Sequence, residues 1–222
     1  MPTDWFRTPA WDEQARIEFE AKLARSAAHN RPQYLRIKAI ALDGAGLTDD
    51  ALTLLSRVVD EYPDALDCAY AFELQGDMLR RSGDLAAAEA SYRTALTRRP
   101  DLNATSGMSP VSLGEVLLEL RGEAAVKEVR SLLNYPALRL VFNSQLVRAL
   151  TLSARAAEVD GDEALRRSEA RKALDLVSAA PQLNRHPDVG VPALSETELR
   201  ELERLASASG APPKKRTWLR RR

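Results

Sequence analysis

The sequence predicts an all-α protein built from antiparallel helix pairs, on three observations. Apolar residues recur at spacings of three, four and seven, which is the pattern of helices with one buried face. Aromatic residues make up only 5% of the 222 residues and charged residues 29%, and with abundant alanine and leucine this suits helices packed through small side chains. Finally, shifting the chain against itself by 37 residues superimposes two segments of one design.

The two superimposed segments run from 32 to 64 and from 69 to 101. Gly46 and Gly83 interrupt them midway, and glycine can take a positive φ at the end of a helix. Each segment closes on a proline, which cannot continue a helix. We therefore expect two helices and a tight turn in each, with the second segment's first helix opening about a turn early, near Ala65. The matched pairs are Leu35/Phe72, Ala39/Gly76, Leu42/Leu79, Gly46/Gly83, Ala51/Ala88, Leu55/Tyr92, Val58/Ala95, Val59/Leu96 and Pro63/Pro100.

The segment at 69–101 resembles the tetratricopeptide repeat (TPR), a helix-turn-helix unit of about 34 residues. The residues that match the family pattern, in order, are Phe72, Gly76, Gly83, Ala88, Tyr92, Ala95 and Pro100. The copy at 32–64 departs from it, with Ala39 for glycine, Leu55 for the aromatic residue and Val58 for alanine. The resemblance implies a TPR-like α-solenoid. Because two repeats rarely suffice to bury their apolar faces, we expect helices in the flanking segments too.

The flanking elements follow from capping signals. Thr8-Pro9 predicts the start of an N-terminal capping helix over about 9–26, with a stripe of Trp11, Ala15, Phe19 and Leu23. Degenerate helix pairs are expected over about 109–180, opening at Ser109-Pro110 and, in the second pair, from Arg139, with a turn at Asp160-Gly161-Asp162. Ser195 to Glu198 forms a capping box before a final helix over about 196–208. We expect one array over 1–209 and a basic, disordered tail over 210–222.

Residue composition indicates where the protein is located and what kind of genome encodes it. The single cysteine, Cys68, cannot form an intrachain disulfide, so we expect a reducing compartment. The N-terminus has no secretory signal, and no apolar run is long enough for a membrane span. Arginine outnumbers lysine by 26 to 6, which suggests a bacterial genome. A cytoplasmic bacterial protein is the expectation.

The sequence shows no constellation typical of catalysis. His29 and His186 stand alone, without partners at metal-ligand spacing. Gly44 and Gly46 follow a predicted helix and lack a third glycine, so they indicate a hairpin turn instead of a phosphate loop. Cys68 is expected to be a small buried residue. We therefore expect no enzyme activity, no metal and no cofactor.

The resemblance implies a partner-binding groove lined by the first helix of each repeat. Matching the family's groove positions to this sequence one residue at a time gives Gln33, Arg36, Ile40, Asp43, Tyr70, Glu73, Asp77 and Arg80. The carboxylate clamp of chaperone-binding members is absent, since Ile40 replaces its asparagine. Acidic Glu73 and Asp77 favour a basic or mixed peptide. An ordinary solvated helix face is the alternative interpretation.

The net charge is zero, but the C-terminal tail is basic. Its candidate anion-binding residues are Lys214, Lys215, Arg216, Trp218, Arg220, Arg221 and Arg222. The tail could contact nucleic acid, bind an anionic membrane surface, fold back on the acidic body, or only aid solubility. The leading function is a protein–protein adaptor that binds a partner segment on the concave face. The alternative is a nucleic-acid-associated accessory protein that uses the tail, and self-association stays open.

Overall fold

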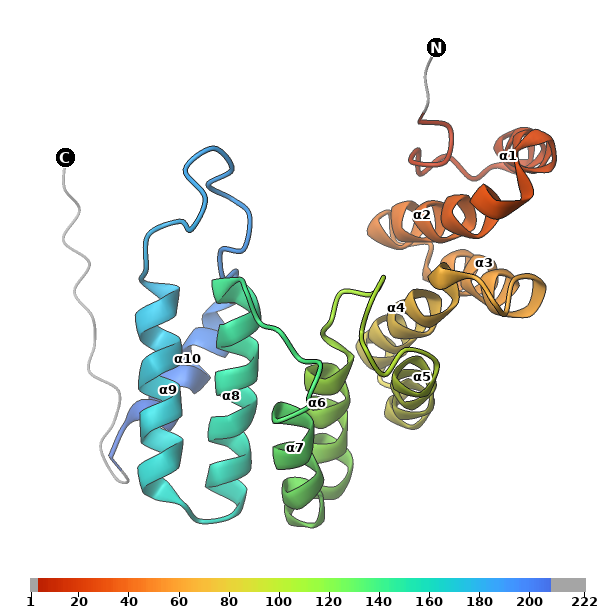
Figure 1. The fold of residues 1–222 in the computed structure, drawn as a ribbon. Coiled ribbons are helices and arrows are strands. Elements are labelled where there is room, and N and C mark those ends of the chain that lie inside the picture. The colour runs from red at the N-terminus through yellow and green to blue at the C-terminus, as the bar shows by residue number, and fades with distance from the viewer. Residues whose placement is uncertain (1–3, 209–222) are drawn as a thin grey trace, which may run out of the picture. The chain divides into compact units, whose positions relative to one another are not determined.

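The computed structural model describes residues 4–208, and these contain helices and no strands. The chain divides into two compact units, residues 1–116 and 117–222, with the boundary inside α6. The sequence prediction of one array over 1–209 stays a prediction. The elements in order are α1 (Glu13–Arg25), η1 (Ala28–Asn30), α2 (Arg31–Gly44), α3 (Thr48–Glu61), α4 (Leu66–Ser82), α5 (Leu85–Arg98), α6 (Ser109–Arg121), η2 (Gly122–Ala125), α7 (Val126–Leu133), α8 (Asn143–Val159), α9 (Glu163–Val177) and α10 (Glu196–Ala206) (Figure 1).

In the first unit, both predicted segments are helix pairs. α2 pairs with α3, and α4 pairs with α5. Gly46 has a φ of 83° and Gly83 a φ of 87°, so the turns use the left-handed region that glycine enters without a Cβ clash. α4 begins at Leu66, about a turn before the predicted segment, as expected. Asp84 caps α5 by accepting a hydrogen bond from the Ala87 amide.

The start of α1 differs from the prediction. The helix begins at Glu13 instead of near Pro9, and the Asp12 side chain caps it by accepting from the Ala15 amide at 2.8 Å. The reason is long-range: the Lys38 ammonium donates to the backbone carbonyls of Thr8 and Ala10 at 2.6 and 2.9 Å. These carbonyls are therefore held outside a helix by a residue 28 to 30 positions later.

Lys38 is only 1% exposed although it carries a charge. Its ammonium also lies 5.0 Å from the Trp11 ring centroid and 5.6 Å from that of Phe19, which are attractive cation–π distances. Burial lowers the pKa of Lys38. The N-terminal segment therefore packs on α1 and α2 through a buried cation and the aromatic rings of Trp5, Phe6, Trp11, Phe19 and Tyr34.

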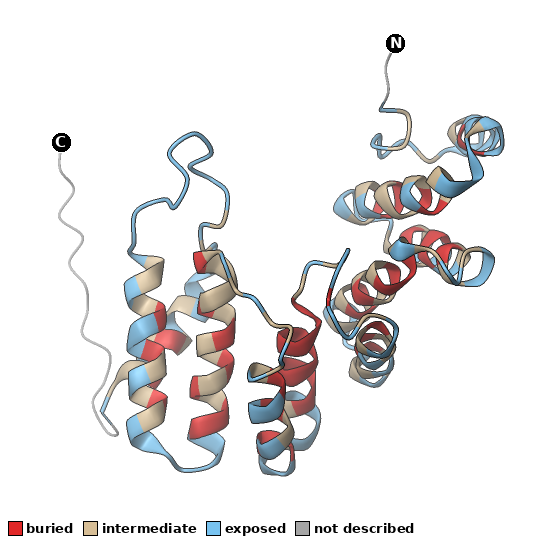
Figure 2. Ribbon diagram, in the orientation of Figure 1, coloured by how far each residue is buried: buried red, intermediate tan, exposed pale blue. Residues whose placement is uncertain are grey.

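Apolar side chains from successive helices of the first unit form its core. Leu35 and Leu42 of α2, Leu55 and Val58 of α3, and Tyr92 of α5 are fully buried. Figure 2 shows buried residues as stripes along the helices, with exposed residues on other faces of the same helices. The stripes are the predicted apolar faces, so the packing confirms the helical periodicity.

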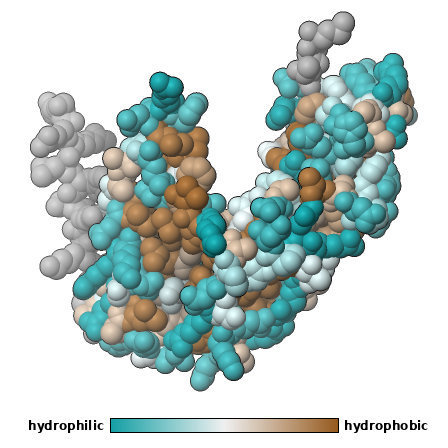
Figure 3. Space-filling view, viewed as in Figure 1, coloured by the Kyte–Doolittle hydropathy of each residue, from teal (hydrophilic) through white to brown (hydrophobic). Residues whose placement is uncertain are grey.

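The second unit is centred on the α8–α9 hairpin. Gly161, with a φ of 75°, makes the predicted turn between the two helices. α8 begins at Asn143 instead of Arg139, because the Gln145 side chain accepts from the amides of Val141 and Phe142 and closes the chain there. Hydrophobic residues gather on the visible face of this unit near the start of α8 (Figure 3), where Val141 is 64% exposed.

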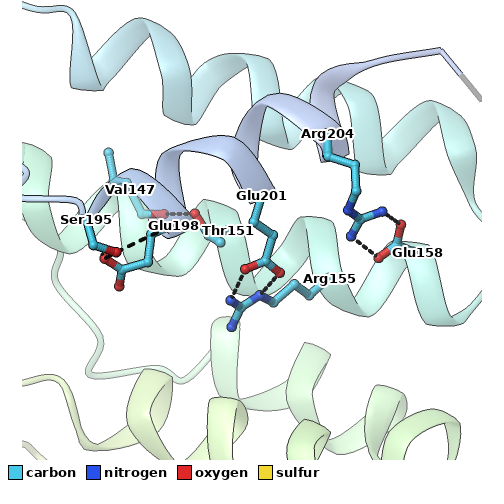
Figure 4. A network of polar contacts seen from close by, with 8 residues as sticks. All are labelled: Val147, Thr151, Arg155, Glu158, Ser195, Glu198, Glu201 and Arg204. Carbon is cyan, nitrogen blue, oxygen red and sulfur yellow. Dashed lines mark hydrogen bonds and ion pairs between the residues drawn. The ribbon is translucent and has the colours of Figure 1, made fainter. Parts of the chain in front are cut away.

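α10 packs on α8 and α9, as Figure 4 shows from close by. The predicted capping box is confirmed: the Ser195 hydroxyl accepts from the Glu198 amide, and the Glu198 carboxylate accepts from the Ser195 amide. Two double-contact ion pairs tie α10 to α8, between Glu201 and Arg155 and between Arg204 and Glu158.

The apolar side of α10 is buried against α8 and α9. Leu202 and Leu205 are 1% and 0% exposed and join a core with Val147, Ala154 and residues of α9. At the other end, the buried guanidinium of Arg166 donates to the backbone carbonyls of Leu205 and Ser207. Arg166 therefore satisfies carbonyls that the helix C-terminus leaves without an intrahelical partner.

Candidate binding face on helices α2 and α4

The predicted groove positions follow one face of α2 and one face of α4. Within each helix they are spaced by three, four or seven residues, which places them along one side of the helix axis. The two faces meet through Arg36, whose guanidinium donates to the Asp67 carboxylate at 2.6 Å. The same guanidinium lies 4.7 Å from the Tyr70 ring centroid. α2 and α4 therefore present a shared surface within the first unit.

Three apolar or neutral side chains on this surface are exposed. Gln33 is exposed, Ile40 is 40% exposed and Leu66 is 56% exposed. Sequence reasoning missed Leu66, although it precedes Tyr70 by one helical turn and so lies on the same side of α4. The signal was that α4 was expected to open early, near Ala65, which places Leu66 in the helix. We call Gln33, Arg36, Ile40, Leu66 and Tyr70 the α2–α4 patch.

The two acidic side chains of α4 at the predicted positions, Glu73 and Asp77, accept hydrogen bonds from other residues of the protein. Glu73 was expected on the open face, but it is only 1% exposed. Its carboxylate accepts hydrogen bonds from the hydroxyls of Ser106 and Ser109. Asp77 accepts a 2.6 Å hydrogen bond from the hydroxyl of buried Tyr92. Neither carboxylate is therefore presented as an open acidic site, which removes the physical basis for the expected preference for a basic segment.

The remaining two predicted positions also have ionic partners. Arg80 pairs with the Glu115 carboxylate. The Asp43 carboxylate accepts from Arg81 at 2.6 and 2.7 Å and from the Thr48 hydroxyl at 3.1 Å. Arg36, Asp43 and Arg80 are thus each paired with an opposite charge outside the predicted set, namely Asp67, Arg81 and Glu115.

Burial shifts the pKa of Tyr70 in the patch and of Glu73 on the same helix. Burial raises the pKa of Glu73, and the hydrogen bonds from Ser106 and Ser109 only partly oppose this shift. Burial also raises the pKa of Tyr70, with a further contribution from the nearby Glu73 carboxylate. Tyr70 therefore stays a neutral phenol that can donate a hydrogen bond at neutral pH.

We expect Glu73→Gln to stabilise the protein at neutral pH. Because the folded-state pKa of Glu73 lies above its ordinary value of 4.5, the protonated group favours folding below that value, and the contribution is lost as pH rises through the folded pKa. Glutamine stays neutral and keeps an acceptor for the serine hydroxyls. The difference in the free energy of unfolding between variant and parent, measured in urea, should grow from acid to neutral pH.

Exposed Glu123 gives the matched control for this substitution. Glu123→Gln should leave the free energy of unfolding at neutral pH within about 0.5 kcal/mol of the parent. A Glu73→Gln variant that is less stable than the parent at neutral pH would show that the ionised carboxylate stabilises the fold.

Among residues 4–208, no group of three or more His, Cys, Asp or Glu side chains is placed to hold a metal ion. Cys68 is buried, and burial raises the pKa of its thiol, which disfavours the nucleophilic thiolate. The described helices include none with the length and apolar character needed to cross a membrane. The predicted anion-binding residues 214–222 lie outside the described residues.

Comparisons of the chain with protein-family models, with curated proteins and with solved structures give no match. The residues and their geometry alone therefore carry a functional assignment.

Proposed function

We propose that this chain is a protein–protein interaction adaptor that holds a partner segment on the α2–α4 patch. Its helix pairs act as a TPR-like solenoid, with α1 and α10 as the capping helices. The proposal is supported by the glycine turns, by Ala88 and Tyr92 buried at the positions the repeat pattern requires, and by α4 opening where the longer period predicts.

The observation that carries the function is the exposure of Ile40 and Leu66, each one helical turn from a member of the Arg36–Tyr70 cation–π contact. Clustered apolar residues rimmed by polar ones mark binding surfaces more often than scattered ones do. Arginine and tyrosine are also the side chains most enriched at the energetic centres of interfaces.

The patch favours a partner segment with apolar side chains and backbone groups that can hydrogen-bond. Ile40 and Leu66 supply apolar area, while Gln33 and the Tyr70 hydroxyl supply hydrogen-bonding groups. Since Arg36 is already neutralised by Asp67, a strongly charged segment has little to gain here. We therefore expect the affinity for an apolar partner segment to depend only weakly on salt concentration.

Ile40→Arg tests the proposal. The side chain is 40% exposed, so arginine fits without disturbing the core, but a partner seated there would have to desolvate its charge. We expect capture of the partner from lysate of cells that express the protein to fall about tenfold or more, corresponding to a loss of over about 1.4 kcal/mol. Quantitative mass spectrometry of the captured proteins provides the measurement.

Ile17→Arg is the matched control, since Ile17 is 58% exposed on α1 and lies outside the patch. A protein lost by the Ile40 variant and kept by the Ile17 variant supports the adaptor function. If every protein captured by the parent is captured equally by Ile40→Arg, the α2–α4 patch is not the binding face.

A further inference from the structure

A buried carboxylate on α4 has no positively charged partner. Glu73 is 1% exposed and forms no ion pair with any described residue; its hydrogen-bond donors are the hydroxyls of Ser106 and Ser109. Glu115 in the same unit is 8% exposed, but its carboxylate pairs with the Arg80 guanidinium. An ionised carboxylate that is buried without a cation costs far more free energy than the neutral acid. The closed structure therefore favours a protonated Glu73.

The connection between α5 and α6, residues 99–108, reaches this carboxylate through Ser106. Ser106 is itself exposed, so solvent lies directly beyond the contact. In the described part of the chain, the hydrogen bonds that join this connection to α4 all end on Glu73. Its other hydrogen bonds are local, such as the one that the Thr105 hydroxyl donates to the Leu102 carbonyl. We call residues 99–108 the α5–α6 loop.

The backbone of the α5–α6 loop is strained in this position. Leu102 and Ala104 have φ values of 59° and 60°, a region that residues with a Cβ rarely enter. Such conformations persist where the surrounding contacts impose them. The side chains of Leu102 and Met108 are buried and hold the two ends of the strained stretch. Between them, the bond from Ser106 to Glu73 holds the loop against α4.

We propose that the α5–α6 loop is a pH-sensitive cover on α4, closed while Glu73 is protonated and released when Glu73 ionises. An ionised Glu73 gains hydration only when the loop moves away, whereas the neutral acid gains much less. Opening also relieves the strain at Leu102 and Ala104. It exposes Glu73, which lies one helical turn beyond Tyr70 on the same side of α4. This device lies within the first unit and does not depend on the partner proposed for the α2–α4 patch.

The titratable groups around Glu73 act in the same direction. Burial is the main cause that raises the pKa of Glu73, and the negative charge of Asp77, one turn further along α4, raises it too. From α5, Tyr92 donates its hydroxyl to Asp77, and burial raises the pKa of Tyr92 so that it stays neutral. The loop and α6 contribute the neutral hydroxyls of Ser106 and Ser109, which lower the pKa of Glu73 only in part.

The arginines of this side of α2 and α4 already hold other carboxylates. On α2, the Arg36 guanidinium pairs with Asp67. On α4, the Arg80 guanidinium pairs with Glu115 of α6. Neither supplies a counter-charge that would keep an ionised Glu73 in the closed position.

The direction of the pH dependence follows from the raised pKa of Glu73. Because the pKa in the closed form lies above the ordinary value of 4.5, the closed loop holds the proton more tightly than the open loop does. Below the ordinary value the closed form is fully favoured. As pH rises from there through the closed-form pKa, the ratio of open to closed loops grows by up to about tenfold per pH unit and then levels off.

Hydrogen–deuterium exchange of the full chain, followed by mass spectrometry, measures this opening from about pH 5 to about pH 9. We expect the protection of amides 102–108, corrected for the chemical exchange rate at each pH, to fall about tenfold or more in the parent. Glu73→Gln cannot ionise, so its protection should stay constant within about twofold. The matched control Asp101→Asn removes an exposed carboxylate of the same loop and should keep the fall seen in the parent.

Four results would overturn the inference. The first is loop protection in the parent that does not change with pH, which needs no variant to observe. The second is a fall in Glu73→Gln as steep as in the parent, and the third is no fall in Asp101→Asn, because another group would then control the loop. The fourth is protection of the loop equal to that of α5 at every pH, because the loop would then open only when the whole unit unfolds.

Discussion

Replacing Gly76 with alanine is expected to lower the free energy of unfolding by about 2 kcal/mol. An added Cβ at this position would lie 2.7 to 2.8 Å from three ring carbons of Tyr92. Tyr92 is fully buried and its hydroxyl is bonded to Asp77, so the ring has no space into which to withdraw. The strain exceeds the roughly 1 kcal/mol that alanine gains over glycine in a helix. Urea unfolding followed by circular dichroism measures the loss.

Gly44→Ala is the control for this substitution. Gly44 is also helical, as the last residue of α2, but an added Cβ there meets nothing within 4 Å. Alanine at this site should leave stability unchanged or raise it by up to about 1 kcal/mol. Equal stabilities of the Gly76 and Gly44 variants would mean that α4 and α5 do not pack through Gly76.

Truncating Leu202 to alanine is expected to cost about 3 kcal/mol. Leu202 is 1% exposed and reaches from α10 into the core of the α8–α9 hairpin. Its loss leaves a cavity that the neighbouring alanines cannot fill, because Arg166 and two ion pairs hold α10 in place. Thermal and urea unfolding of the variant provide the measurement.

Leu183→Ala deletes the same atoms from the loop before α10, where the side chain is 40% exposed. It should change stability by less than about 0.5 kcal/mol. A Leu202 variant as stable as the Leu183 variant would show that α10 contributes no apolar burial to the second unit.

The helices, their turns and several of their caps could be predicted because local chemistry determines them. Gly46, Gly83 and Gly161 make turns that need a positive φ. Ser195 and Glu198 form the capping box that their spacing in the sequence predicts. α1 began late because Lys38 holds the carbonyls of Thr8 and Ala10 from outside the helix. No local pattern in residues 8–13 records that contact.

The binding face was predicted only in part, for a similar reason. Helical spacing gave the side of α4 on which Glu73 lies, but not what covers that side. The loop after α5 passes through Leu102 and Ala104, whose φ values of 59° and 60° are unusual for residues with a Cβ. This path delivers Ser106 and Ser109 to the Glu73 carboxylate. Such a path cannot be read from periodicity.

Site-specific photo-crosslinking tests the adaptor function most directly. A photoreactive amino acid at position 40 places the probe in the α2–α4 patch, and one at position 17 places it on α1, on a side chain of comparable exposure. We predict a discrete crosslinked partner at position 40 that is absent at position 17, with its crosslinked peptide rich in apolar residues. Identical crosslinks from both positions, or none from position 40 while the intact protein still captures its partner, would contradict the function proposed for this face.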